Sequence, residues 1–174
     1  MIKDYKIEKM SILAMMIAMD VVLSPLLRVE GIAPMSSVMN VIAAVLMGPV
    51  YGTLMALSCG ILRMILFGIP PLALTGAVFG AFLSGIGYRL TSKYLAAIIG
   101  EFIGTGLVGS LLSYPVMVWF TGSAQGMYWF VYTPRFIIGA LSGSIMAYFI
   151  LIRLDKLAYI QHVKGIFWPT IKKI

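Results

Sequence analysis

The sequence predicts an all-α integral membrane protein with six transmembrane helices and cytoplasmic N and C termini. Hydrophobic residues make up 61% of the 174 residues and charged residues 11%, whereas soluble proteins have about 45–50% and about 25%. A soluble domain of this length could not bury so many apolar side chains, and the excess on its surface would aggregate. Most Lys and Arg residues lie at the ends of apolar segments, which is typical of membrane topology and not of a nucleic-acid interface. The expected surroundings are therefore the lipid bilayer of the cell membrane, with no nucleic-acid partner.

A helix needs roughly 20 apolar residues to cross about 30 Å of hydrocarbon, and six apolar segments are the candidate spans. They span residues 9–27, 36–47, 50–67, 72–88, 94–119 and 130–152. The first is not a cleaved signal peptide, because Asp20 and the Ser24-Pro25 pair interrupt it. The second and third are divided at Gly48-Pro49, since proline resists continuing a helix and glycine readily reverses the chain. The second helix is then about 18 Å long, too short to cross alone, and leaves a gap at one end.

Charge bias predicts the orientation of these helices. With a cytoplasmic N terminus, ten of the thirteen Lys and Arg residues lie in or beside cytoplasmic segments, and the others are Arg28, Arg63 and Arg135. Both termini are basic, so an even number of crossings follows. Six is favoured, and four crossings with residues 36–67 as a re-entrant hairpin is the alternative. The outer loops are then 28–35, 68–71 and 120–129, and the gap above the second helix opens outward.

The expected domain organisation is simple. Residues 1–155 form one six-helix membrane domain, and residues 156–174 form a cytoplasmic or interfacial tail whose aromatic and basic residues suit the inner headgroup layer.

Small residues four apart mark where helices in lipid can approach closely. Such pairs occur at Ala14 and Ala18, Gly76 and Gly80, Gly100 and Gly104, and Gly139 and Gly143. Most are expected to be internal packing sites. The alanine pair lies near the cytoplasmic end of the first helix, where a partner subunit could dock.

Charged residues within the spans are functional candidates, because a charge in the membrane is costly. Asp20 lies about 16 Å up the first helix and Arg63 about 19 Å up the third. A structural bridge between them and a direct ligand role for Arg63 both remain open. Glu101 lies about 10 Å from the inner end of the fifth helix, and Arg135 lies near the outer end of the sixth, so these two are not expected to meet.

Polar and aromatic residues gather at the expected outer side. Arg135 with Trp129, Tyr128 and Tyr132 fits either an aromatic belt with a snorkelling arginine or the mouth of a site for a flat, ring-containing ligand. Further hydrogen-bonding groups come from Asn40 and from the Ser113-Tyr114-Pro115 segment. The expected substrate-binding residues are Asn40, Arg63, Glu101, Ser113, Tyr114, Trp129, Tyr132 and Arg135.

The chain carries no phosphate-binding loop, zinc-protease motif or serine-nucleophile motif. His162 lies in the expected tail and Cys59 is the sole cysteine. We therefore expect no enzymatic activity, no cofactor and no metal site. The two matched halves with broken helices that many secondary transporters show are also missing. If the protein moves a solute against a gradient, a partner must supply the energy.

The sequence resembles the substrate-binding S components of energy-coupling factor (ECF) vitamin transporters, and among them the ThiW type. The resemblance covers nearly all of residues 7–155. It is carried by three long runs: AMMIAMDVVLSPLLRVEGIAPM at 14–35, NVIAAVLMGPVYGTLMALSCGILRMILFG at 40–68, and GEFIGTGLVGSLLSYPV at 100–116.

This resemblance implies a six-helix protein that captures hydroxyethylthiazole, the thiazole precursor of thiamine, from outside the cell. It also implies partners: a transmembrane coupling subunit, which would contact the A-x-x-x-A pattern of Ala14 and Ala18, and two ATPase subunits. The loop between the first two helices, residues 28–37, would act as an outer lid. An S component for another precursor, such as the thiamine pyrimidine, and a non-transporting membrane scaffold are the alternatives.

Overall fold

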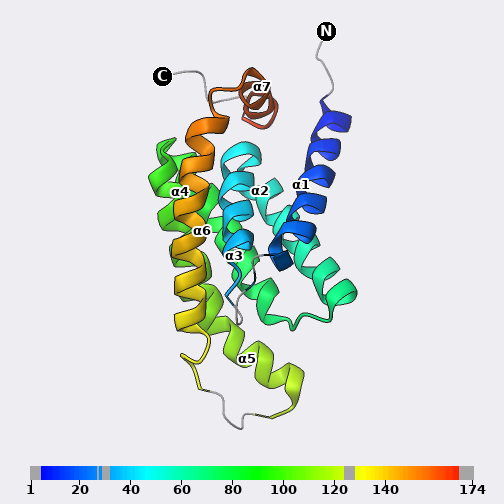
Figure 1. Ribbon diagram of the computed structural model, residues 1–174, viewed down its shortest axis with the longest axis vertical. Coiled ribbons are helices and arrows are strands. Elements are labelled where there is room, and N and C mark those ends of the chain that lie inside the picture. The colour runs from blue at the N-terminus through cyan, green and yellow to red at the C-terminus, as the bar shows by residue number, and fades with distance from the viewer. Residues whose placement is uncertain (1–4, 27, 29–31, 124–127, 169–174) are drawn as a thin grey trace.

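The computed structural model describes residues 5–26, 28, 32–123 and 128–168, and every regular element within them is a helix (Figure 1). The prediction of an all-α protein is therefore confirmed. The elements are α1 (Lys6–Leu26), α2 (Pro34–Phe67), α3 (Leu72–Thr91), α4 (Tyr94–Glu101), η1 (Phe102–Gly109), α5 (Ser110–Thr121), α6 (Thr133–Leu154) and α7 (Ala158–Phe167).

Four helices in the described part of the chain are long and apolar enough to cross a membrane. They are Pro34–Phe67, Leu72–Thr91, Tyr94–Thr121 and Thr133–Leu154. The start of α1 and the end of α6 lie at the same end of the bundle (Figure 1). This agrees with an even number of crossings, while six crossings and the cytoplasmic position of both termini remain predictions.

Helix α2 reverses direction at Gly48, as the sequence predicts. Gly48 has a non-helical backbone conformation, with φ 82° and ψ 178°, and Pro49 follows it. Arg63 Nη1 donates a hydrogen bond to Ser36 Oγ over 3.5 Å. In a straight helix these residues would lie about 40 Å apart. Residues 34–47 and 49–67 are therefore two antiparallel halves of a helical hairpin.

The first half of this hairpin is the centre of the molecule. All thirteen residues from Ser37 to Pro49 are buried, and the main hydrophobic cluster surrounds them with side chains of α1, α6 and α7. A helix that is apolar on all sides is stable when other helices enclose it. The short helix therefore needs no lipid contact along its length, and the space above its first residues is bounded by protein.

The prediction of one helix over 94–119 is confirmed by α4, η1 and α5, which run without interruption from Tyr94 to Thr121. The sequence pattern gave no indication that residues 102–109 form a π-helix. π-Helical turns are rare and often occur at functional sites. This one begins directly after Glu101.

Glycines bring this helix against α3. A Cβ atom at Gly100 or Gly104 would collide with the carbonyl oxygens of Leu83 and Phe79, and one at Gly109 would lie 2.7 Å from the Gly76 Cα. These glycines are therefore packing sites within the bundle, as expected from their spacing.

The C-terminal segment packs against the bundle at the end where α1 begins (Figure 1). Val163 and Ile166 of α7 are buried in the main hydrophobic cluster, and Trp168 Nε1 donates a hydrogen bond to the Val45 carbonyl over 3.0 Å. Asp155 Oδ1 lies 2.6 Å from Lys164 Nζ. Partial burial raises the pKa of Asp155, but hydrogen bonds from Lys164 and Tyr94 outweigh it and lower the pKa below its usual value.

Candidate functional site

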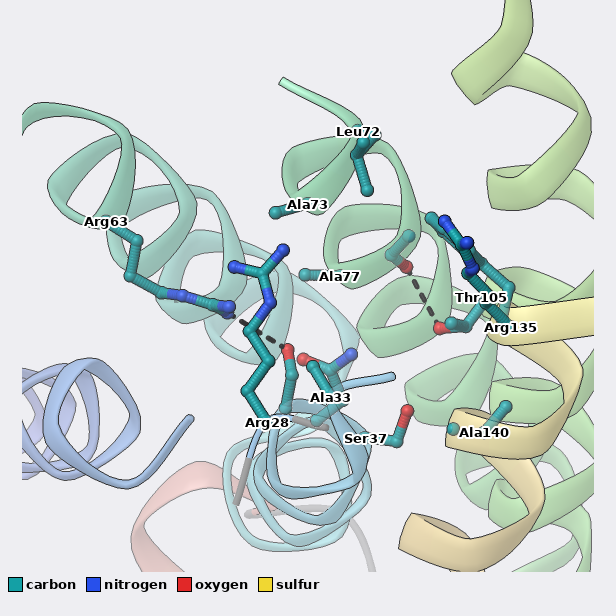
Figure 2. A pocket seen from close by; sticks show the side chains of 15 residues that line it. Arg28, Ala33, Ser37, Arg63, Leu72, Ala73, Ala77, Thr105, Arg135 and Ala140 are labelled. Atoms are coloured by element: carbon teal, nitrogen blue, oxygen red, sulfur yellow. Dashed lines mark hydrogen bonds between the residues drawn. The ribbon is translucent and has the colours of Figure 1, made fainter. Parts of the chain in front are cut away.

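A cavity of about 60 Å³ lies above the first residues of α2 (Figure 2). It lies at the end of the bundle where the short first half of the hairpin begins. The sequence predicts a gap at this end. Its walls come from residue 28, both halves of α2, and α3, η1 and α6. The lining residues are Arg28, Ala33, Ser36, Ser37, Asn40, Arg63, Leu72, Ala73, Gly76, Ala77, Thr105, Arg135, Phe136, Gly139 and Ala140.

Three arginines from three different segments line this cavity (Figure 2). Arg63 of α2 is 2% exposed, Arg28 is half-buried, and Arg135 in the first turn of α6 is exposed. Burial lowers the pKa of Arg28 below its ordinary value, and the positive charge of Arg63 lowers it further. The cavity is therefore a strongly cationic environment.

Arg63 forms no direct ion pair with an acidic side chain of the described residues, although Asp20 is near enough to interact with it electrostatically and both residues contact Cys59. Its Nη1 bonds to Ser36 Oγ, and its Nε has no hydrogen-bond partner. Asp20 is fully buried and accepts a short hydrogen bond from Ser24. Of the two interpretations that the sequence left open, the direct Asp20–Arg63 bridge is not formed in the described part of the chain, and the arginine faces the cavity instead.

Glu101 lies behind the lining and connects two helices. It is fully buried, and its Oε1 accepts hydrogen bonds from Asn40 Nδ2 over 3.2 Å and from Thr105 Oγ1 over 2.8 Å. Asn40 and Thr105 themselves line the cavity. The carboxylate therefore positions two polar side chains at the cavity wall without being part of that wall.

One further buried atom at the wall has no partner in the described structure, namely Asn40 Oδ1. Buried polar atoms normally find a hydrogen-bond partner. An acceptor at Asn40 and a donor at Arg63 Nε are thus both free to bond to a ligand or to ordered water. The cavity can hold a small molecule that carries polar groups on one side.

Besides Glu101, four of the expected binding residues lie outside this cavity. Ser113 is buried against α3, where its hydroxyl lies 2.6 Å from Thr75 Oγ1. Tyr114 packs against Trp129 with ring centroids 4.7 Å apart, and Tyr132 directly precedes α6. None of the four is among the lining residues. Their expected part in binding stays a prediction, and the geometry favours Asn40, Arg63 and Arg135.

Sequence reasoning missed other lining residues, for which signals existed. Thr105 is four residues from Glu101, so that both lie on the same helix face. Arg28 is one of only three Lys and Arg residues outside the segments that the sequence predicts to be cytoplasmic, and Phe136 directly follows Arg135. Ser36 and Ser37 lie in the first turn of the short helix, at the end where the sequence predicts a gap.

A second cavity of about 380 Å³ lies between α1, the first half of α2 and the ends of α6 and α7. Its lining is methionine-rich and has no charged side chain. It is formed by Ile12, Met15, Met16, Met19, Leu23, Met35, Val38, Met39, Ile42, Leu46, Ile150, Leu154, Tyr159, Ile160 and Val163. A polar small molecule needs placed polar groups to fix its orientation, so the arginine-lined cavity is the better candidate.

The alanine pair of α1 lies on the outside of the bundle. Ala14 and Ala18 are both exposed, and so are Met10, Met15 and Val22 around them. This pair differs from the glycine pairs, which pack internally. An exposed face with small side chains is compatible with a docked helix from another subunit, which remains a prediction.

Comparison with known proteins identifies the family of the chain. No curated protein and no solved structure matches the chain. A family model described as thiamine-precursor transporter protein (ThiW) matches residues 10–157. The match covers most of the chain and includes every residue that lines the arginine-lined cavity. The protein therefore belongs to the ThiW family of thiamine-precursor transporters, which are multi-pass membrane proteins and not enzymes.

Proposed function

We propose that the protein is the substrate-binding S component of an ECF transporter and that it captures hydroxyethylthiazole from outside the cell. The observation that carries this proposal is the arginine-lined cavity, because two buried polar atoms without a partner and an aromatic side chain belong to its lining residues. Membership of a thiamine-precursor family supports a thiamine-related ligand.

The lining provides both kinds of contact that a thiazole alcohol needs. Phe136, Ala77 and Ala140 offer apolar surface for the ring. Asn40 Oδ1 can accept a hydrogen bond from the alcohol, and Arg63 Nε can donate one to an oxygen or nitrogen of the ligand. Glu101 contributes indirectly, since it holds the Asn40 amide in place.

The size of the cavity indicates that the site is closed in this structure. Its volume is about 60 Å³, whereas an engineered cavity of about 150 Å³ is known to admit benzene. A five-membered ring with an ethyl alcohol needs a comparable space. Ligand entry therefore requires the walls to move apart. Residues 28–37 supply Arg28, Ala33, Ser36 and Ser37 to the lining, which supports their expected role as an outer lid.

The remaining parts of the proposal concern topology and partners. The hairpin of α2 supplies two of six crossings, both termini are cytoplasmic, and the arginine-lined cavity opens to the outside of the cell membrane. A transmembrane coupling subunit docks on the face that carries Ala14 and Ala18, and two ATPase subunits supply the energy.

The test is a binding screen with the purified protein against thiamine, hydroxyethylthiazole and the thiamine pyrimidine. We expect the wild type to bind hydroxyethylthiazole saturably. In Asn40→Ala, which removes a buried hydrogen-bonding group, the affinity should fall by about tenfold or more. Gln161→Ala, on the exposed side of α7, is the matched control and should bind normally.

The outcomes separate the alternatives. Tight binding of the pyrimidine and none of the thiazole would contradict the substrate and retain an S component. Stabilisation by no compound in a thermal shift screen would favour a membrane scaffold and contradict the proposal as a whole.

A further inference from the structure

The cavity contains more positive charge than a neutral thiazole alcohol requires. Arg28, Arg63 and Arg135 all line it. No acidic side chain of the described residues forms an ion pair with any of them. Arg63 is 2% exposed, and its Nε has no hydrogen-bond partner. The nearby Asp20 offsets only part of the positive charge of the three arginines, and buried charges need partners, so this arrangement is suited to a group that brings negative charge.

Asp20 and Glu101, the acidic residues that are buried in the described part of the chain, do not provide that charge within the cavity. Asp20 is engaged with Ser24. Glu101 Oε1 accepts from Asn40 and Thr105, and Glu101 Oε2 faces α3, where it lies 2.5 Å from the position that a Cβ of Gly80 would take. Neither residue is among the cavity lining. Asp20 interacts electrostatically with Arg63 from outside the cavity, and no carboxyl group of the described residues lines the cavity itself.

Three helix N-termini add to the positive potential at the same place. The first turns of α2, α3 and α6 all supply lining residues, namely Ser36 and Ser37, Leu72 and Ala73, and Arg135 and Phe136. The N-terminus of a helix carries a partial positive charge and unpaired N–H groups, which favour anions. At α2, no side chain caps the first turn, but Pro34 has no N–H and the Ser36 N–H donates a hydrogen bond to the Ala33 carbonyl over 3.2 Å, so this terminus contributes mainly through its dipole.

The volume of the cavity also fits an anionic group. A cavity needs about 10–15 Å³ to hold one water molecule. The volume of about 60 Å³ therefore accommodates a compact group of several atoms, whereas a ring enters only if the walls move apart. The closed cavity therefore has room for a compact anionic group and not for the ring.

We propose that the cavity between Arg28, Arg63 and Arg135 binds a phosphate-type anion, carried by the ligand as a phosphate monoester or bound as free phosphate beside a neutral ligand. Planar guanidinium groups suit phosphate oxygens, because they donate parallel hydrogen bonds. The choice of a thiazole ligand rests on the proposed function, whereas the anion site rests on the arginines and helix termini.

The experiment measures binding to the full-length protein in nanodiscs of phosphatidylcholine, which has no net charge. The probes are hydroxyethylthiazole, its phosphate ester and inorganic phosphate. We expect either the ester to bind at least about tenfold more tightly than the alcohol, or inorganic phosphate to strengthen binding of the alcohol by a similar factor. The first result assigns the anion to the ligand and the second to free phosphate, and both support an anion site. Either effect should weaken as the salt concentration rises.

Variants then locate the anion. Arg135→Gln should remove most of the advantage of the phosphate, and because Arg135 is exposed, this protein should fold. Arg153→Gln is the matched control, an exposed arginine at the other end of α6, and it should behave as the wild type. Equal phosphate effects in Arg135→Gln and Arg153→Gln would overturn the proposal.

The same data distinguish a failure of this inference from a failure of the proposed function. Normal binding of the alcohol, with no advantage for the ester and no effect of phosphate, overturns the anion site and retains the thiazole ligand. Arginine-dependent binding of inorganic phosphate without binding of either thiazole compound supports the anion site and contradicts the thiazole ligand.

Discussion

Gly80 is the position at which a single methyl group should disturb the site most directly. It lies on α3 and faces the π-helix. A Cβ atom at this position would lie 2.5 Å from Glu101 Oε2 and closer still to Thr105 Oγ1. Ordinary contact begins at 3.4 Å, so the carboxylate must retreat by about 0.9 Å and the hydroxyl by more. Gly80→Ala therefore displaces Glu101, which supports Asn40 at the cavity wall, and it displaces Thr105, which is itself part of that wall.

The cost follows from three contributions. Overpacking a tight contact costs about 1–3 kcal/mol, and losing a hydrogen bond to a buried carboxylate costs about the same again. The higher helix propensity of alanine stabilises the folded protein by about 1 kcal/mol and offsets part of this cost. The expected net loss is about 3 kcal/mol. By the scaling known for soluble proteins of similar length, this lowers the unfolding temperature by about 6–12 °C.

The assay is thermal unfolding of the purified protein in detergent, followed by ligand binding at a temperature where both proteins are folded. Gly106→Ala is the control, because its Cβ would lie 3.5 Å from Ile137 Cγ1 and 3.7 Å from Phe102 Cδ2, which is ordinary contact. We expect little change there. If Gly80→Ala unfolds no earlier than Gly106→Ala and binds ligand as well, Glu101 does not support the cavity wall in this way.

Three further predictions concern the hairpin, the C-terminal helix and the α1 face. Gly48→Ala should destabilise the protein by about 1–2 kcal/mol, because Gly48 has φ 82° and a Cβ there would lie 3.3 Å from the Trp168 ring. Gly165→Ala is the control and should not destabilise the protein, because a Cβ at Gly165 meets open space. Equal unfolding temperatures of the two variants would contradict this prediction. The lowered pKa of Asp155 means that its contribution to stability is present above its usual pKa of 3.8 and is lost as the pH falls through the lower folded value. The intrinsic fluorescence of the three tryptophans, of which Trp168 is one, should report this loss in an acid titration of the wild type and not of Asp155→Asn, and identical titrations would refute it. Ala14→Trp together with Ala18→Trp should abolish uptake in cells and preserve ligand binding, whereas normal uptake would show that this exposed face is not the coupling surface.

Much of the fold was predictable, since it depends on local properties of the chain. Apolar length indicates helices, and the Gly48-Pro49 pair indicates the reversal, because only glycine adopts positive φ at low cost and proline cannot donate the next helical hydrogen bond. The glycine pairs at α3 and η1 likewise indicate close helix contact through their spacing alone. The π-helix at 102–109 has no comparable local signal.

The site was predictable only in part. Asn40, Arg63 and Arg135 stand out as polar residues among apolar ones, and they line the cavity. Ser113, Tyr114, Trp129 and Tyr132 stand out as well, yet they are not among its lining residues. Position along the membrane normal can be counted from sequence, but the direction in which a side chain points around its helix depends on how the helices pack.

The sequence by itself determined that this protein is a helical membrane protein with a reversal at Gly48 and with costly charges inside its helices, because hydropathy, proline and glycine act through the local chain. Only the tertiary structure decided that Arg28, Arg63 and Arg135 line one cavity. It also decided that Glu101 bonds to Asn40 and does not line that cavity, and that α7 packs against the bundle through Trp168. Those facts depend on the rotation and tilt of each helix. Packing among all the helices sets rotation and tilt together.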